Sequence, residues 1–319
     1  MNNNKVEYIK LCESEPTLPI FMQNWWLDAV CTEGGLSWNV ALAKNKNGSI
    51  DAILTYVVRK KWGLKIVTVP HLTKFTGIWQ APLPYATHYE NCHEEHKRIK
   101  DLISQLPDFH RLTLNLNTNL TDWSPFYWAG FSQSTRYVQV LDSGENKETL
   151  FKNLNRGTKR SIKKAEEHFT VIEKNDFETF IKLNTAVFER QNIANPIPLS
   201  TWQNLDPILV EKQQRRIYFS IDKLGVAHGT FYMVWDNNMA YGLASGLTEM
   251  GRTNGAMAQL TWQAISDASD MGLSFNFLGS MIPSIESFLR GFNAVKKPYF
   301  VLTKSKNWFI EGIFKLIGK

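Results

Sequence analysis

One order of predicted elements occurs twice in the sequence, and this repeat constrains the fold more than any single motif. In each half, a helix precedes three strands joined by short turns, and a helix, a strand, a short helix and a closing strand follow. Asn47-Gly48 separates two strands of the first triplet, and Gly225 has the corresponding place in the second. Asn-Gly between β-rich segments predicts a hairpin, because both central residues of the tight turn need positive φ. The repeat therefore predicts two copies of one supersecondary unit.

The closing segments of the two halves also agree in a few letters. The first half ends in FYWAGFSQSTRYVQVL and the second in SFLRGFNAVKKPYFVL. Gly130-Phe131 then corresponds to Gly291-Phe292, and Tyr137 corresponds to Tyr299. The agreement supports duplication, although the shared order of elements carries more of the argument than the shared letters.

A change of composition marks the predicted boundary between the halves. Asp142–Asn146 is small and polar, as inter-domain segments are. A chain of 319 residues exceeds the usual size of one domain, and its hydrophobic content of 43% is enough for two cores. We predict two domains, residues 1–145 and 146–319, each an α/β (α+β) unit.

Charge and hydropathy narrow the class of protein. The formal charge of +6 and the pI near 9.0 favour partners that carry phosphate, such as a nucleotide cofactor, a nucleic acid or an anionic membrane surface. The first residues, MNNNKVEYIK, lack the apolar run of a secretory signal, and no apolar stretch approaches the ~20 residues of a membrane span. We expect a cytoplasmic protein without a transmembrane segment. Cys12, Cys31 and Cys92 are too widely spaced for a zinc site, so we expect no metal.

The stretch from Tyr241 to Phe300 contains the leading candidate site. Its pattern predicts a strand, a glycine-rich turn and a helix, and the turn contains Arg252, Asn254 and Gly255. Free backbone N–H groups and the positive end of a helix dipole at such a turn can bind a phosphate. An alternative stays open, because glycines also occur at a strand-to-helix turn only to let the backbone turn.

A strongly basic segment opens the second half. The letters KETLFKNLNRGTKRSIKKAEEHF predict one helix, and spacings of three and four residues place Arg156, Lys159 and Arg160 near one another on it. This surface could bind a diphosphate or RNA phosphates. In the alternative interpretation, Glu148, Glu166 and Glu167 pair with these cations and the helix is an ordinary solvated one.

With these elements in place, the chain resembles the GNAT acyltransferases. A mixed, largely antiparallel sheet flanked by helices, present twice and with a basic helix opening the second copy, resembles the Fem-type aminoacyl transferases and the wider FemAB-like or BioF2-like acetyltransferase domains. The letters that carry the resemblance are WWLDAV, LNRGTKRSIKKAEE and FNFLGSMIPSIESFLRGFNAVKKPY, which together lie in both halves. The resemblance implies a tandem GNAT-like fold.

The sequence departs from the pattern of the family at three positions. Asn276 and Leu278 stand where the related stretch has an acidic pair around its Phe. The GNAT phosphate turn, Arg/Gln-x-x-Gly-x-Gly/Ala, is matched by Arg252 and Gly255, whereas its last place holds Met257 and Ala256 comes one residue early. A Met side chain there is expected to crowd a pyrophosphate. The resemblance thus nominates four residues for cofactor binding, namely Arg252, Asn254, Gly255 and Ala256.

Few side chains are needed for the chemistry that the resemblance implies. Positioning an amine against an activated acyl group, together with an N–H that stabilises the oxyanion, can supply most of the rate. Candidates for proton transfer or donation are His228 on a predicted central strand, Ser280 and Glu286 after the FNFLG strand, and Tyr299 in the closing strand. For each, a structural role is the alternative: a hydrogen-bonded histidine in a sheet, a helix cap or surface charge, and a buried tyrosine.

Three functions remain open from the sequence. The first is transfer of an acyl (acetyl) group from acyl-coenzyme A to an amine of a small-molecule or cell-envelope acceptor. The second keeps the fold but takes aminoacyl-tRNA as donor, with a peptidoglycan precursor as acceptor. The third is a GNAT-like protein that only binds a polyanion or a membrane. The C-terminal letters NWFIEGIFKLIGK are apolar on one side, so they predict either a contact with a membrane surface or packing on their own domain.

Overall fold

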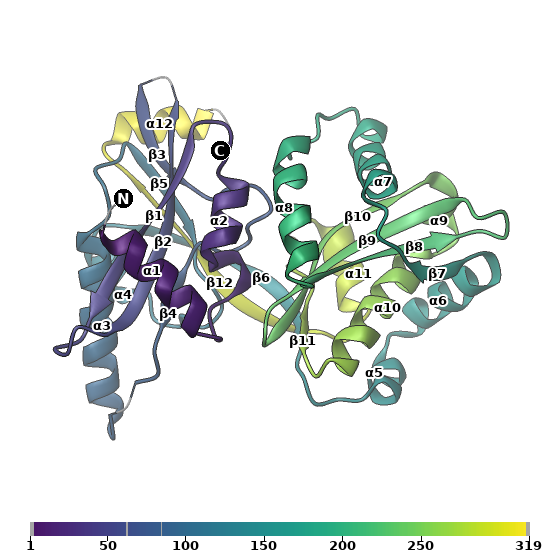
Figure 1. The fold of residues 1–319 in the computed structure, drawn as a ribbon, viewed down its shortest axis with the longest axis horizontal. Helices are drawn as coiled ribbons and strands as arrows, with labels where there is room; N and C mark the ends of the chain where they lie inside the picture. Colours follow the sequence, from purple (N-terminus) through teal and green to yellow (C-terminus); the bar gives the residue numbers. More distant parts are fainter. Residues whose placement is uncertain (1–2, 62, 84, 317–319) are drawn as a thin grey trace. The chain divides into compact units, whose positions relative to one another are not determined.

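The chain forms two compact units (Figure 1). A computed structural model describes residues 3–61, 63–83 and 85–316. The first unit comprises Met1–Arg136 and Pro298–Lys319, and the second comprises Tyr137–Lys297. Each unit has its own sheet with helices against it, which is the α/β architecture expected from the sequence.

A five-stranded path forms the sheet of the first unit, in the order β1-β2-β3-β5-β12, and β4 pairs with β2 beside it. All of these pairs are antiparallel except β3 with β5. The strands are β1 (Leu36–Lys44), β2 (Ile50–Lys61), β3 (Leu64–Thr68), β4 (Ile78–Gln80), β5 (Arg111–Asn115) and β12 (Val295–Ser305). The helices are α1 (Asn3–Ser14), η1 (Ile20–Met22), α2 (Asn24–Val30), α3 (His88–Ser104), α4 (Ser124–Trp128) and α12 (Trp308–Leu316).

Alternation along β1 explains how helices cover both faces of this sheet. Ala41 and Ala43 join a core with Ile99 and Leu102 of α3. Trp38 points to the opposite face, where its ring lies 5.9 Å from the ring of Tyr8 in α1. Because successive strand residues face opposite sides, one strand anchors a helix on each.

The sheet of the second unit follows the order β6-β11-β10-β9-β8-β7. Only β10 with β11 is parallel. The strands are β6 (Ser132–Leu141), β7 (Thr170–Glu173), β8 (Arg215–Ile221), β9 (Ala227–Trp235), β10 (Met239–Leu247) and β11 (Ser274–Asn276). The helices are α5 (Lys147–Asn153), α6 (Arg156–His168), α7 (Phe177–Arg190), α8 (Leu199–Glu211), α9 (Glu249–Thr253), α10 (Ala256–Asp270) and α11 (Pro283–Arg290).

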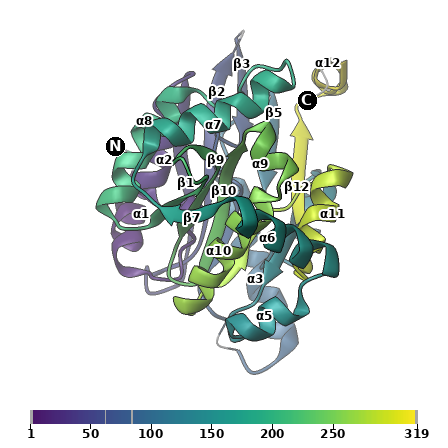
Figure 2. The same cartoon turned by 90° about the vertical axis from the view of Figure 1, so that its right-hand side faces the viewer.

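Two helical layers cover this second sheet, with α7 and α8 on one side and α6 and α10 on the other (Figure 2). Along β9, Phe231 and Met233 belong to the core that includes Leu260 of α10. The intervening Tyr232 faces α7 and α8, where its ring lies 4.9 Å from Phe180 and 5.2 Å from Trp202. The run from Phe231 to Val234 is apolar because both faces of the strand are buried there.

Each unit contains a strand from the other half of the sequence. The last part of β12 pairs with β5 in the first unit, from Val301 opposite Asn115 to Ser305 opposite Arg111. In the second unit, Leu141 at the end of β6 pairs with Phe275 of β11. The predicted division between residues 145 and 146 stays a prediction, since these units are defined by packing.

The repeated order predicted from the sequence is present in the structure. A helix, three antiparallel strands, a helix, a strand, a short helix and a strand run from α2 to β6 and again from α8 to β12, with β4 and α9 added. Both hairpin glycines have positive φ, 84° at Gly48 and 81° at Gly225. The letters Trp62-Gly63 also predict a turn between two strands; Gly63 has positive φ, whereas Trp62 lies outside the described residues. The N-terminal helix α1 was not predicted.

The basic segment departs from its prediction, because it forms two helices where one was expected. Leu154 has an extended backbone with ψ 144°, and the side chain of Asn155 accepts a hydrogen bond from the N–H of Gly157 at 2.6 Å. Asn155 therefore caps a new helix, α6, instead of continuing α5. Asn155 is therefore the residue in this segment that signals the start of a new helix.

Helix α6 packs closely on the start of α10, and Gly255 makes this contact possible. Gly255 is the N-cap of α10 with φ 80°, and a Cβ atom there would overlap the carbonyl oxygen of Ser161 in α6. Both the left-handed backbone and the close approach require glycine. The glycine is thus explained by packing before any ligand is considered.

We predict that Gly255→Ala lowers the free energy of unfolding by about 3 kcal/mol, the sum of the left-handed backbone cost and overpacking. Gly272→Ala is the matched control, since Gly272 has φ 70° but open space around it, and only the backbone cost of about 1 kcal/mol applies. Urea unfolding of both variants measures the difference. Equal losses would contradict the packing role of Gly255.

Candidate functional site in the second unit

An irregularity in β10 defines the candidate site. Gly242 pairs with Met233 of β9 and Ala244 pairs with Tyr232, so Leu243 between them has no partner in the register. This is a β-bulge, in which one extra residue is left out of the ladder and the strand bends. The backbone N–H and carbonyl of Leu243 are therefore not used in the ladder with β9, and a ligand could bind to them.

The neighbouring strand parts from β10 at the same place. β11 pairs with β10 over three residues, from Met239 opposite Ser274 to Tyr241 opposite Asn276. Beyond this point a cavity of about 290 Å³ lies between the diverging segments. It is lined by Phe231, Gly242, Leu243, Ala244, Ser245, Met257, Thr261, Phe277, Gly279, Ile285, Phe288 and Leu289. Its volume is close to the lower end, about 300 Å³, of sites for small molecules.

The cavity wall is mainly apolar, but two buried polar atoms lie on or next to it. Among the described residues, neither Oγ1 of Thr261 nor Oε1 of Gln139 has a hydrogen-bond partner, and both residues are 1% exposed. Gln139 stands behind Gly279, where a Cβ atom would lie 3.1 Å from its Oε1. Buried polar groups are nearly always paired in folded proteins. These two atoms therefore offer hydrogen-bonding capacity at the cavity that no described residue uses.

The turn between β10 and α10 is a capped and internally paired structure. Thr248 Oγ1 accepts a hydrogen bond from the N–H of Gly251 at 3.2 Å. Arg252 forms hydrogen bonds of 2.5 and 3.0 Å to Glu249, which raise the pKa of Arg252 and lower that of Glu249. Asn254 donates to the carbonyl of Met250 at 3.2 Å.

The four residues nominated for cofactor binding therefore fall at one place, around the first turn of α10, and their role stays a prediction. Arg252 is exposed, Gly255 caps the helix, and Ala256 is fully buried. The cation of Arg252 is neutralised by Glu249 in this structure. A phosphate here would use the backbone N–H groups at the start of α10 first.

His228 lies at the edge of this turn and outside the cavity wall. Its ring nitrogens are 3.1 Å from Thr248 Oγ1 and 3.0 Å from Asp222 Oδ2. Hydrogen bonding from the N–H of Val226, followed by the contact with His228, lowers the pKa of Asp222. His228 thus joins two turns, which is the structural alternative given for it above, and a catalytic role remains a prediction.

The other three nominated side chains have different surroundings. Glu286 is on α11, where an ion pair with Lys296 at 2.7 Å lowers its pKa, so it is a weaker base than a free carboxylate. Ser280 follows the cavity residue Gly279, and its Oγ accepts from the N–H of Ile282 at 3.1 Å. Tyr299 is 2% exposed and belongs to the first unit.

The basic residues nominated for substrate binding begin α6. Arg156 and Arg160 are exposed, and Lys159 is half-buried with its Nζ donating to the carbonyl of Lys152 at 2.7 Å. Lys164, one turn further, donates to the carbonyl of Thr253 at 2.9 Å. The basic face therefore reaches the turn that leads into α10.

The three departures from the family pattern acquire structural explanations. The side chain of Asn276 accepts a hydrogen bond from the N–H of Leu278 at 2.8 Å and so fixes the turn after β11. Leu278 has φ 58°, a conformation that this turn requires. Met257 lies on the cavity wall, so its side chain takes up space in the cavity. From the sequence, the same side chain is expected to crowd a pyrophosphate at the turn.

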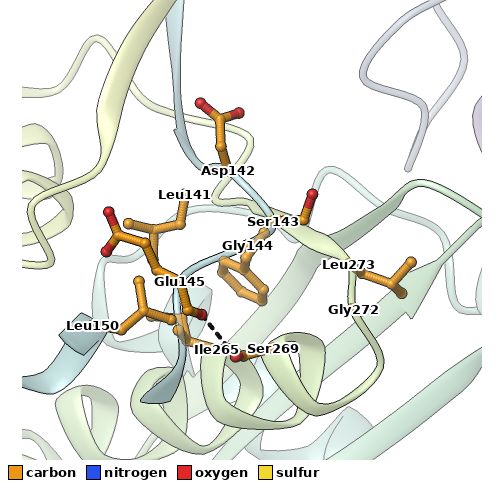
Figure 3. Close-up of a pocket in the computed structure, with 11 residues that line it drawn as sticks. Leu141, Asp142, Ser143, Gly144, Glu145, Leu150, Ile265, Ser269, Gly272 and Leu273 are labelled. Atoms are coloured by element: carbon orange, nitrogen blue, oxygen red, sulfur yellow. Dashed lines mark hydrogen bonds between the residues drawn. The ribbon is translucent and has the colours of Figure 1, made fainter. Parts of the chain in front are cut away.

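A second hollow in this unit is too small for a substrate. It has a volume of about 20 Å³ and is lined by Asp142, Glu145 and Ser269 among others (Figure 3). Ser269 Oγ donates to the carbonyl of Glu145 at 3.2 Å across it. Such a volume holds about one water molecule.

Sequence reasoning missed the residues that shape the cavity. Leu243, Thr261 and Gln139 were not nominated, although Gly242 and Gly246 in the strand YGLASGL were a usable signal. Glycine inside a strand often marks a bulge or a close backbone approach. Gly246 meets the second condition, because a Cβ atom there would overlap the backbone of Leu183 in α7.

Comparison with known proteins agrees with this geometry. Residues 151–282 match the family model of the acetyltransferase (GNAT) domain. The matched residues all lie in the second unit, which therefore contains a GNAT domain of the FemAB-like and BioF2-like kind. No curated protein matches the sequence.

Solved structures resemble the chain over nearly its whole length at low sequence identity. FemX has a TM-score of 0.67 at 11% identity, covering 100% of this chain and 99% of its own. L-PGS from Bacillus licheniformis has a TM-score of 0.52 at 9% identity, with coverages of 92% and 91%. The C-terminal domain of a proposed lysylphosphatidylglycerol synthetase from Agrobacterium fabrum has a TM-score of 0.52 at 12% identity, with coverages of 88% and 90%. These similarities confirm the fold.

The unpaired hydroxyl of Thr261 gives a prediction in which stability and binding move in opposite directions. Thr261→Val removes a buried polar atom without a partner, so the free protein should gain about 1 kcal/mol. If a ligand uses this hydroxyl, donor binding should weaken about three- to tenfold, the equivalent of one hydrogen bond. Thermal unfolding measures the first effect, and titration with acetyl-coenzyme A or with aminoacyl-tRNA measures the second.

Thr230→Val is the matched control. Oγ1 of Thr230 is also buried and without a partner among the described residues, but Thr230 on β9 does not line the cavity. Both variants should be stabilised, and only Thr261→Val should bind the donor less tightly. Loss of binding in both would show that the effect does not arise at the cavity.

Proposed function

We propose that this protein is an N-acyltransferase whose second unit holds the reactive end of the acyl donor in the cavity beside β10. The observation that carries the proposal is Leu243, a residue left out of the strand ladder on the wall of a cavity of about 290 Å³. A backbone N–H at such a position can donate to the carbonyl oxygen of the donor and, more strongly, to the oxyanion that forms from it. The GNAT family match of this unit supports the same chemistry.

The reaction follows from this arrangement. The amine nitrogen attacks the donor carbonyl carbon, a C–N bond forms, and the tetrahedral oxyanion is held by backbone N–H groups. The bond from the carbonyl carbon to the sulfur or oxygen of the donor then breaks, and the amine proton passes to a base or to water. Positioning and oxyanion stabilisation supply most of the rate in this scheme, so no side chain has to act as nucleophile.

Filling the cavity tests this proposal. Ala244 lines the cavity next to the bulge, and Ala244→Leu should abolish acyl transfer by occupying the space of the acyl group. Ala227→Leu adds the same volume at another half-buried position, the first residue of β9, and should leave activity intact. Activity is measured by mass-spectrometric detection of acylated amines, with urea unfolding to confirm the fold. Full activity in folded Ala244→Leu would exclude the cavity as the donor site.

The proposal has two versions, which differ in the acyl donor: acyl-coenzyme A or aminoacyl-tRNA. With acyl-coenzyme A as donor, acetyl-coenzyme A at 100 times its dissociation constant should stabilise the protein by about 2.7 kcal/mol. The backbone N–H groups at the start of α10 would then hold the pyrophosphate. Absence of any thermal shift would remove this version and leave the second one.

The second version takes aminoacyl-tRNA as donor, as the Fem-type resemblance implies. Its specific support is the contact between Lys164 and the carbonyl of Thr253, which brings the basic face of α6 to the turn before α10. The overall similarity to FemX, a full-length match, also favours it. The acceptor in this version is an amine of a peptidoglycan precursor or other cell-envelope molecule.

Charge reversal tests the basic face. The double variant Arg156→Glu and Arg160→Glu should weaken tRNA binding by more than tenfold and flatten its dependence on salt, because fewer counterions are released. The double variant Lys182→Glu and Lys223→Glu changes the net charge equally at exposed positions elsewhere in the same unit. Equal losses in both variants would show only a general charge effect. Binding of tRNA without any transfer would support a protein that binds without catalysis.

A membrane contact by α12 is compatible with either donor. Trp308 is 82% exposed and Phe309 is 60% exposed, whereas Ile310 is 8% exposed. The helix thus packs on its own unit through one side and presents aromatic rings on another. Residues 317–319 of the predicted tail lie outside the described residues, and no helix among the described residues is long and apolar enough to span a membrane.

A further inference from the structure

Two cationic side chains lie against Tyr299 in the first unit. Nζ of Lys74 lies 5.1 Å from the centre of the Tyr299 ring. Burial raises the pKa of Tyr299 and lowers that of Lys74, and the nearby cation of Arg136 lowers both. Tyr299 is 2% exposed, so Lys74 lies over a buried ring.

The backbone that presents Lys74 is held on both sides. The carbonyl of Lys74 accepts from Nδ2 of Asn115 at 3.0 Å, and the N–H of Thr76 donates to the carbonyl of Asn115 at 3.1 Å. Phe75 packs edge-on against Tyr299, with ring centres 5.4 Å apart. Such supports are typical of a preorganised site rather than of a mobile surface lysine.

The electrostatics of this cluster are unfavourable without a counter-ion. Burial, followed by repulsion from Arg136, lowers the pKa of Lys74 to about 8. Among the described residues, no carboxylate forms an ion pair with Lys74 or Arg136. Two neighbouring cations, one of them largely out of water, are destabilising unless an anion joins them.

We propose that Lys74 and Arg136, beside Tyr299, form a binding site for an oxyanion, a phosphate or carboxylate group of a molecule that the protein binds. Arg136 supplies a planar fork of donors, and Lys74 supplies a point charge. Arg136 is exposed and Lys74 half-buried, so a ligand can reach both. The three residues belong to the first unit, whereas every residue that lines the donor cavity belongs to the second.

The experiment uses the reactivity of Lys74 in the full-length protein. Lysines are acylated by a water-soluble reagent between pH 7 and 10, and the modified peptides are quantified by mass spectrometry. We expect Lys74 to titrate near pH 8 and to be far more reactive at that pH than ordinary lysines. Inorganic phosphate or acetate is then added at constant ionic strength against sodium chloride.

A bound anion should raise the pKa of Lys74 and slow its acylation. A rise of one unit reduces the unprotonated fraction at pH 8 from about one half to about one eleventh, a slowing of about fivefold. Protection by phosphate, by acetate or by both supports the site and identifies the group it prefers. Protection by neither, or equal slowing at the exposed control Lys46, would overturn the proposal.

A variant separates binding from folding. Arg136→Gln retains an exposed polar side chain, so it should fold normally, and it should abolish the protection of Lys74 by the anion. Lys46→Gln, an equal change of charge in the same unit, should leave the protection unchanged. Full protection in folded Arg136→Gln would exclude Arg136 from the site. Activity at the donor cavity does not enter these measurements, so their outcome is independent of the proposed acyl transfer.

Discussion

The parting of β10 and β11 is the feature on which the candidate site depends. Three residue pairs hold the strands together, and then Asn276 turns the chain by accepting the N–H of Leu278. Leu278 and Gly279 both have positive φ, so the chain cannot continue as a strand beside β10. The gap is closed at its sides by α10 and α11, which leaves the cavity. Without this turn, β11 could continue to pair with β10, and the two strands would leave no cavity between them.

The same region shows a conflict between stability and function. An apolar cavity with two unpaired buried polar atoms is less stable than a filled core, because each such atom has lost its water without gaining a partner. A ligand with matching donors and acceptors removes this penalty when it binds. The unpaired atoms therefore lower the stability of the free protein, and pairing them with a ligand would add to the binding free energy. Such local losses of stability are expected at functional sites.

Local patterns predicted most of the architecture and little of the site. The alternation of strands, the glycines of the hairpins and the repeated order were sufficient for the tandem fold, because each depends on neighbouring residues. The break at Asn155 was missed because the basic letters continue through it. Leu243 could not be identified as a bulge from its own letter, since its unpaired state depends on how β9 and β10 align. Thr261 and Gln139 became notable only when their burial without partners was known.

The strands exchanged between the halves govern the order in which this protein can assemble. As the chain emerges from the ribosome, the sheet of the first unit has β1, β2, β3 and β5 but lacks β12, whose pairing residues 301–305 follow all the strands of the second unit. The edge of β5 stays unsatisfied until then, and an open strand edge invites wrong pairing. The second unit, by contrast, has its borrowed strand β6 before the rest of its sheet is made. Synthesis thus favours completion of the second unit first, and β12 then completes the first.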